Sequence, residues 1–217
     1  MYNDRLLFCL HGFLRTGVSM WWMSSVLADL GYKDRFTPTF GLHLHTLEYN
    51  ARQLHTQILD ALANTGTTSI DVVTYSMGGL LIRAVLTLFP DTPINTLVMI
   101  APPNQGAEMA EFVRRWIPLH ELGWDPLAPL LPDVPNNLNE PPNHIDVGII
   151  AGHKGNGKGY TPFLAEDNDG KVCLSETRLN RSHHWIAVKG RHPSLILHPT
   201  PIRNTKLFLQ RTTFTEL

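Results

Sequence analysis

The chain has 217 residues, of which 43% are hydrophobic and 17% charged, so it is long enough to bury a core of its own and predicts one compact domain. Its 18 Lys and Arg residues against 19 Asp and Glu give a formal net charge of -1, and with no long basic run this argues against nucleic acid as a partner. The first apolar run, 6–10, is too short for a signal peptide or a membrane-spanning helix. We therefore expect a soluble, cytoplasmic protein with no integral membrane segment, unless a leader has been trimmed.

The first part of the chain predicts a strand followed by two helices. Residues 6–10 are continuously apolar, as expected of a strand that is buried on both faces. Helical spacing of apolar residues follows over 22–30, which ends at Gly31, and over 47–62, which Thr46 could cap. These two helices are expected to cover the sheet to which the strand belongs.

The remaining elements continue the alternation of strands and helices. Residues 70–75 predict a strand, and 79–89 predict a helix that is apolar almost all round and stops at Pro90. Further strands are expected over 94–101, 145–151 and 185–188, and a last helix over 201–210. Such an alternation predicts an α/β protein with a mostly parallel central sheet flanked by helices.

A proline-rich segment, residues 102–144, separates two of the predicted strands. Its first part, 108–117, has the pattern of a helix, whereas the rest carries apolar residues without a clean period. The segment is too short for a separate domain. We therefore predict a single domain over 1–217 with a small, lid-like apolar insertion at about 102–144.

Ser76 stands at the junction between the predicted strand 70–75 and the helix that follows it. A strand that runs into a helix through one serine flanked by small residues predicts a nucleophile elbow, which presents the serine oxygen above the sheet. Gly78 lets the helix and the strand approach closely. Thr74 replaces the first glycine of the G-x-S-x-G pattern. The alternative is that Ser76 only caps a buried helix.

His11-Gly12-Phe13 directly follows the first predicted strand, at the sheet edge where α/β proteins place their sites. A tetrahedral oxyanion requires two N–H donors. We expect the backbone N–H groups of Phe13 and Met77 to supply them, and the His11 side chain to be a hydrogen-bonded turn residue.

A serine nucleophile requires a base, and the base requires an acid that holds its tautomer. Asp169 lies in an acidic turn, and His192 follows the predicted strand 185–188. The chain order Ser76, Asp169, His192 is the order that this architecture uses. Asp167, expected to be a solvated neighbour, is the alternative acid.

These motifs together resemble the α/β-hydrolase superfamily, and in particular its small bacterial esterases and lipase-like members. The resemblance covers about residues 6–209 and rests on the following sequences: His11-Gly-Phe, Thr74-Tyr-Ser-Met-Gly-Gly, Ala101-Pro-Pro-Asn-Gln-Gly, Asn168-Asp-Gly-Lys-Val with Ser175-Glu-Thr-Arg-Leu, and His192. It implies Ser76 as nucleophile, Asp169 as acid and His192 as base. It also implies Phe13 and Met77 as oxyanion donors.

We therefore expect a serine hydrolase that cleaves carboxylic esters through an acyl-enzyme, without a metal or an organic cofactor. Trp116, Leu127 and Leu130 of the insertion are expected to line the acyl pocket, the alternative being ordinary packing over the sheet edge. An acyltransferase or a thioesterase would use the same triad. A silent hydrolase-fold protein that binds a ligand is a further alternative, which Thr74 keeps open.

Other motifs in the sequence are weaker indications of a functional site. Gly152–Gly159 nearly matches a phosphate-binding loop, but Gly159 stands where a Ser or Thr should bind magnesium, so we expect a flexible loop. The pairs His43 with His45 and His183 with His184 lack the spacing of metal ligands. Cys9 and Cys173 are expected to be free, buried thiols.

Overall fold

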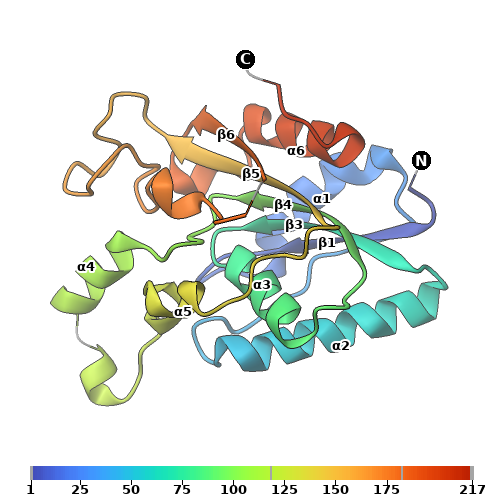
Figure 1. Cartoon of the computed structure of the whole chain (residues 1–217), viewed down its shortest axis with the longest axis horizontal. Coiled ribbons are helices and arrows are strands. Elements are labelled where there is room, and N and C mark those ends of the chain that lie inside the picture. Colours follow the sequence, from blue (N-terminus) through green and yellow to red (C-terminus); the bar gives the residue numbers. More distant parts are fainter. Residues whose placement is uncertain (1, 118, 182, 216–217) are drawn as a thin grey trace.

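The computed structural model describes residues 2–117, 119–181 and 183–215, so residues 1, 118, 182, 216 and 217 lie outside the description (Figure 1). A sheet of six parallel strands in the order β2–β1–β3–β4–β5–β6 forms its centre. The strands are β1 (Arg5–Leu10), β2 (Asp34–Phe36), β3 (Ser69–Tyr75), β4 (Ile94–Ile100), β5 (Asp146–His153) and β6 (His184–Lys189). The predicted parallel sheet is confirmed, and β2 is an additional edge strand.

Helices cover both faces of the sheet (Figure 1). One face carries α2 (Leu47–Thr65) and α3 (Gly78–Leu88), and the other carries α1 (Trp21–Val26) and α6 (Pro199–Arg211). Because side chains alternate along a strand, β1 contributes to two cores. Its residues Leu6, Phe8 and Leu10 pack toward α2 and α3, and Leu7 and Cys9 pack toward α1 and α6.

Two predicted helices differ from the expectation, one because it is interrupted and the other because it begins earlier. The segment 22–30 is not one helix: α1 lies between 3-10 turns over Gly17–Met20 and Leu27–Leu30. The last helix, α6, begins at Pro199 and not at Pro201, because the side chain of His198 accepts the N–H group of Thr200. The predicted Thr46 cap of α2 is confirmed, since its hydroxyl accepts the N–H group of Tyr49.

The segment between β4 and β5 contains α4 (Glu108–Trp116), α5 (Asp133–Asn136) and short 3-10 turns. A buried arginine of α3 holds it against the body of the protein. The guanidinium of Arg83 donates hydrogen bonds to the carbonyl oxygens of Asn104, Pro135 and Leu138 at 2.8, 2.9 and 2.9 Å. Both ends of the segment are thereby attached to the same side chain.

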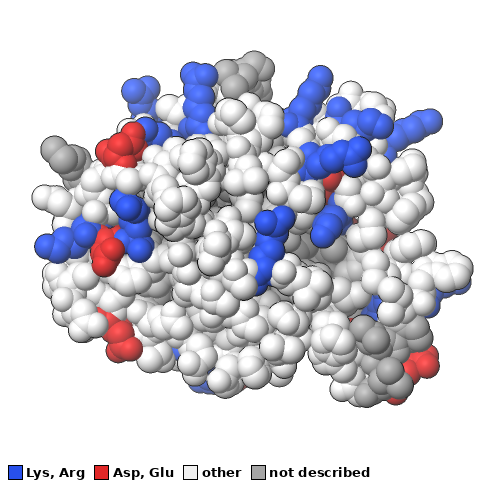
Figure 2. Space-filling model, turned by 180° about the vertical axis from the view of Figure 1, so that it is seen from behind, with Lys and Arg blue, Asp and Glu red and all other residues white. Residues whose placement is uncertain are grey.

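The long loop between β5 and β6 and the helix α4 both lie beyond the carboxyl ends of the strands, the loop above and the helix below in Figure 1. Seen from behind, most of the visible Lys and Arg side chains lie along the upper part of the surface, whereas much of the lower part is uncharged (Figure 2). No helix in the described parts of the chain has the length and the apolar character needed to cross a membrane.

Candidate active site

Ser76 lies in a sharp turn between β3 and α3, with a left-handed backbone φ of 53°. Such a conformation is strained for a residue with a side chain and is typical of a serine at a strand-to-helix elbow. Two glycines make the turn sterically feasible. A Cβ atom on Gly78 would lie 2.8 Å from the carbonyl oxygens of Leu10 and His11, and one on Gly12 would lie 2.9 Å from the Cβ atom of Ser76.

Thr74 does not prevent this turn. Its side chain is completely buried within β3, in register with Leu10 and Met99 of the neighbouring strands. Its hydroxyl group has no hydrogen-bond partner among the described residues. The glycine of the G-x-S-x-G pattern is therefore replaced by a residue that fits the space and leaves one polar group unsatisfied.

Three side chains far apart in the sequence form a continuous hydrogen-bonded chain. His192 Nε2 lies 2.9 Å from Ser76 Oγ, and His192 Nδ1 lies 2.6 Å from Asp169 Oδ2. An ionised carboxylate only accepts hydrogen bonds, so Asp169 fixes the proton on Nδ1 and leaves Nε2 to accept the Ser76 hydroxyl. All three side chains are buried, with 1% of Asp169, 3% of His192 and 8% of Ser76 exposed.

The backbone holds Asp169 and His192 in this arrangement. Asp169 Oδ1 accepts the N–H groups of Lys171 at 3.0 Å and Val172 at 2.9 Å, and its carbonyl oxygen accepts the N–H group of His192 at 2.8 Å. Both oxygens of the carboxylate are therefore satisfied, one by the backbone and one by the imidazole.

Asp167 is not the solvated turn residue that the sequence suggested. Only 9% of it is exposed, and its carboxylate accepts five backbone N–H groups at 2.9–3.1 Å, those of Lys154, Gly155, Asn156, Gly157 and Asn168. Burial opposes its ionisation, but the N–H groups of residues 154–157 outweigh burial and lower the pKa of Asp167 to about 2. The segment that we expected to be a flexible loop is folded around an internal carboxylate.

The two expected oxyanion donors have unoccupied N–H groups. Within the described ranges, neither Phe13 nor Met77 donates its backbone N–H group to another residue. His11 behaves as the expected turn residue: its Nδ1 contacts the carbonyl oxygen of Gly12 at 2.8 Å, and its Nε2 accepts the N–H group of Phe40 at 2.9 Å. Burial lowers the pKa of His11 and keeps the ring neutral.

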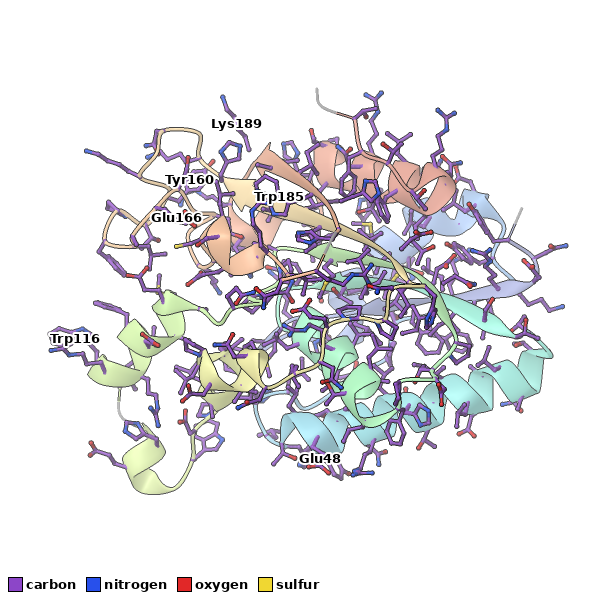
Figure 3. All side chains as sticks on the ribbon, viewed as in Figure 1. Glu48, Trp116, Tyr160, Glu166, Trp185 and Lys189 are labelled. Atoms are coloured by element: carbon purple, nitrogen blue, oxygen red, sulfur yellow. The ribbon has the colours of Figure 1, made fainter. Side chains whose placement is uncertain are left out.

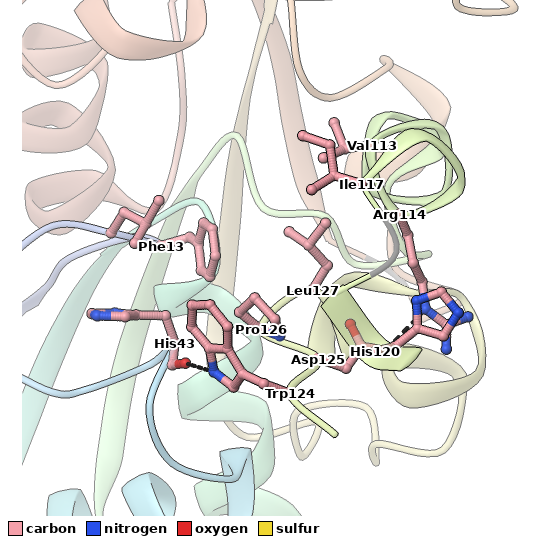
Figure 4. A pocket seen from close by; sticks show the side chains of 11 residues that line it. Phe13, His43, Val113, Arg114, Ile117, His120, Trp124, Asp125, Pro126 and Leu127 are labelled. Atoms are coloured by element: carbon pink, nitrogen blue, oxygen red, sulfur yellow. Dashed lines mark hydrogen bonds and ion pairs between the residues drawn. The ribbon is translucent and has the colours of Figure 1, made fainter. Parts of the chain in front are cut away.

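Ser76 and His192 open into a largely apolar cavity of about 330 Å³. Its walls include Met109, Ala110 and Val113 of α4, together with Leu127 and Leu130. A second cavity of about 190 Å³, shown in Figure 4, shares Phe13, Leu14, Val113 and Leu127 with the first and extends to Ile117 and Trp124. The two cavities are therefore neighbours, and the first is the one that contains Ser76.

Leu127 and Leu130 line the cavity beside Ser76, whereas Trp116 lines neither of the two cavities. Its side chain is 71% exposed, packs against Phe112 and points away from the body of the protein (Figure 3). The face of α4 that meets the cavities carries Met109, Ala110 and Val113, and Ile117 continues it just beyond the helix. Because a helix turns about 100° per residue, Trp116 lies near Met109 on the helix surface, so spacing does not exclude it from the cavity and only its outward placement in the structure does.

One group of described residues brings three potential metal ligands together. Ligand atoms of Glu108, Cys173 and Glu176 lie within 4.8 Å of one another. However, both carboxylate oxygens of Glu176 already accept backbone N–H groups, from Glu108 at 2.6 Å and from Cys173 at 2.7 Å. Burial raises the pKa of the Cys173 thiol to about 12. Glu176 therefore serves to hold the first residue of α4, and its oxygens are already engaged by the backbone.

Solved structures with the same architecture establish an α/β-hydrolase fold. The mature form of the Bacillus licheniformis lipase BlEst2 is 20% identical, with a TM-score of 0.72 over 94% of this chain and 90% of that one. A Listeria innocua gene product is 17% identical, with a TM-score of 0.68 over 97% and 94%. A metagenomic carboxyl esterase is 17% identical, with a TM-score of 0.71 over 90% and 66%.

No curated protein matches the chain. A family model does: it is described as a domain of unknown function, DUF7379, and it matches residues 1–130. The matched part includes Phe13, Ser76 and Met77, together with α4 and the cavity residues up to Leu130. The chain therefore belongs to the DUF7379 family.

Proposed function

We propose that the protein is a serine hydrolase that cleaves carboxylic esters. The observation that carries this proposal is the continuous hydrogen-bonded chain from Ser76 Oγ through His192 to Asp169, which opens into an apolar cavity. A buried serine on a strained turn with an imidazole nitrogen at 2.9 Å has the geometry of an activated nucleophile. The apolar cavity suits the acyl group of an ester.

In the proposed reaction, Ser76 Oγ attacks the acyl carbonyl carbon while His192 Nε2 accepts the hydroxyl proton. The N–H groups of Phe13 and Met77 stabilise the oxyanion of the tetrahedral intermediate. The imidazolium, held by Asp169, then donates its proton to the leaving alkoxide, and an acyl-enzyme forms on Ser76. A water molecule, deprotonated by His192, attacks this acyl-enzyme and releases the carboxylic acid.

A fluorophosphonate probe, followed by mapping of the modified residue, tests the nucleophile directly. We expect the label on Ser76 and hydrolysis of 4-nitrophenyl butyrate by the wild-type protein. Ser76→Ala should abolish the label and lower the rate by at least about a thousandfold, while Ser19→Ala, a change in the surface turn before α1, should do neither. No label and no turnover in the wild type would favour a hydrolase-fold binding protein.

The base is tested by comparing three histidines. His192→Ala should lose activity as Ser76→Ala does. His184, at the start of β6 and packed against Phe208, and His198, at the cap of α6, should tolerate the same change. An inactive His184→Ala with an active His192→Ala would overturn the assignment of the base.

A further inference from the structure

The wall of the Ser76 cavity contains two cations and no carboxylate. Arg15 and Lys171 line it, and no described Asp or Glu does. Two further cations lie close by: the side chains of Arg191 and Lys154 lie over the ring of Tyr160, at 4.4 and 5.8 Å from its centroid. Positive charge is therefore concentrated at one part of an otherwise apolar site.

These cations are not neutralised by the protein. Among the ion pairs of the described residues, none involves Arg15, Lys171 or Arg191. The guanidinium of Arg15 lies over the ring of Tyr75, 5.2 Å from its centroid, and makes one long hydrogen bond of 3.5 Å to the carbonyl oxygen of Pro193. Most of its N–H groups are therefore available to a ligand.

The nearby carboxylates are engaged elsewhere and do not line the cavity. Asp169 is buried and bound to His192 at 2.6 Å, and Asp167 is enclosed by backbone N–H groups. Glu166 and Glu176 are bound to backbone N–H groups outside the cavity wall. An anion that enters the cavity thus meets Arg15 and Lys171 without a competing acidic side chain.

The two cations lie on the histidine side of Ser76. Arg15 contacts Tyr75 and Pro193, which directly adjoin Ser76 and His192 in the chain, and Lys171 lies two residues after Asp169. The apolar wall comes from α4 and from Leu127 and Leu130, whereas Arg15 follows β1 and Lys171 lies in the loop between β5 and β6. The cations and the apolar wall are thus carried by different segments of the chain.

The position of His192 assigns the two halves of an ester. The histidine must reach the leaving oxygen in order to protonate it, so the alcohol portion lies on the side of Arg15 and Lys171. The acyl portion then lies along α4. On the basis of the proposed ester hydrolysis, we propose that the preferred substrates are esters whose alcohol portion carries an anionic group, such as a carboxylate or a phosphate, that binds to Arg15 and Lys171.

A matched pair of substrates tests the charge preference. The two esters are 4-butyryloxybenzoate, which is an anion, and methyl 4-butyryloxybenzoate, which is neutral; their acyl groups are the same. The measured quantity is the ratio of kcat/KM for the anionic ester to kcat/KM for the neutral ester. Comparing this ratio between variants cancels the intrinsic difference in reactivity between the two esters.

Removing either cation should lower the ratio by about fivefold, and removing both should lower it further. The variants are Arg15→Gln, Lys171→Gln and the double variant. Arg15→Lys keeps the charge and should keep most of the ratio, which separates charge from packing. Lys33→Gln, at the amino end of β2 far from the site, is the matched control and should leave the ratio unchanged. Added salt should lower kcat/KM for the anionic ester only.

Two results would overturn the inference, and they are distinguishable. If the wild type hydrolyses both esters and the ratio is the same in Arg15→Gln, Lys171→Gln and Lys33→Gln, the charge preference is wrong and the proposed hydrolase remains. If the wild type hydrolyses neither ester and takes no fluorophosphonate label on Ser76, the proposed function itself fails and the substrate class fails with it.

Discussion

The hydroxyl group of Tyr75 donates a hydrogen bond of 2.9 Å to the carbonyl oxygen of His192, 117 residues further along the chain. The Tyr75 ring also lies against the imidazole, with 5.0 Å between the ring centroids. Burial raises the pKa of Tyr75 and keeps its hydroxyl protonated. The residue that precedes Ser76 thus holds the turn that carries the proposed base.

Tyr75→Phe should therefore lower kcat. The change removes a hydrogen bond and leaves a buried carbonyl oxygen unpaired, which costs about 1 kcal/mol or more and loosens the position of His192. We expect kcat for 4-nitrophenyl butyrate to fall about five- to tenfold, with a smaller change in KM. Tyr49→Phe, on the exposed side of α2, is the control. An unchanged kcat would mean that Tyr75 does not position His192.

The two neighbouring aspartates should respond differently to the same change. Asp169→Asn alters the group that holds the imidazole at 2.6 Å and should lower kcat by about a thousandfold or more, with little loss of stability. Asp167→Asn removes the charge at the centre of five backbone N–H groups and should lower the free energy of unfolding. Kinetics and chemical denaturation of both variants separate the two effects. An Asp167→Asn variant that is as stable as the wild type would contradict this role.

The contribution of Asp167 to the free energy of unfolding should also depend on pH. Its pKa falls from an ordinary value of about 3.9 to about 2 in the folded protein. A carboxyl whose pKa is lowered by folding stabilises the protein above its unfolded pKa, and this stabilisation is lost as the pH falls through the folded pKa. The difference in unfolding free energy between wild type and Asp167→Asn should therefore be full above about pH 4 and shrink toward pH 2. A difference that is independent of pH would exclude an ionised Asp167 as its source.

If the cavity beside Ser76 binds the acyl group, as proposed, its walls should set the preferred acyl chain length. Leu127→Ala and Leu130→Ala should change the ratio of kcat/KM between short and medium acyl esters, because each buried methylene contributes about 0.8 kcal/mol. Trp116→Ala removes a large apolar side chain from the same segment, but from its exposed side, and should leave this ratio unchanged. The three variants are compared on 4-nitrophenyl esters from acetate to octanoate. A uniform change at all chain lengths in the leucine variants would indicate that they only support the fold.

The unsatisfied hydroxyl group of Thr74 should lower the stability of the protein. Valine has nearly the shape of threonine, and Thr74→Val removes a buried hydroxyl that has no partner among the described residues. An unsatisfied buried polar group costs about 1–3 kcal/mol, so the variant should gain about 1 kcal/mol of unfolding free energy and keep its activity. Chemical denaturation measures the gain. A loss of stability would mean that the hydroxyl binds a water molecule.

Strong local patterns made most of the sheet predictable. The continuous apolar run of β1 and the strand-to-helix pattern around Ser76 each reflect burial on both sides of a strand, and the structure contains both elements. The edge strand β2 has only three residues, and its first two, Asp34 and Arg35, are exposed. Such a strand leaves no apolar signal, and it forms because the edge of β1 offers unpaired backbone groups.

The residues around the candidate site were harder to predict, because their positions depend on tertiary contacts that the sequence does not reveal. Apolar composition placed Trp116 in the pocket, whereas only the rotation of α4 decides which of its residues face Ser76. The glycine-rich stretch before Asp167 resembled a phosphate-binding loop because both need backbone N–H groups that converge on an anion. Here the anion is a side chain of the same chain, 10–13 residues further on, and only the fold brings it there.

Arg83 has a consequence for how this chain could be altered. Its guanidinium binds Asn104 near the start of the segment between β4 and β5, and Pro135 and Leu138 near its end. The attachment belongs to α3, which follows Ser76 directly, and not to the residues in between. An exchange of residues 109–131 would therefore leave these three contacts of Arg83 in place. Under the proposed function, replacement of this stretch is the natural route to a changed acyl selectivity.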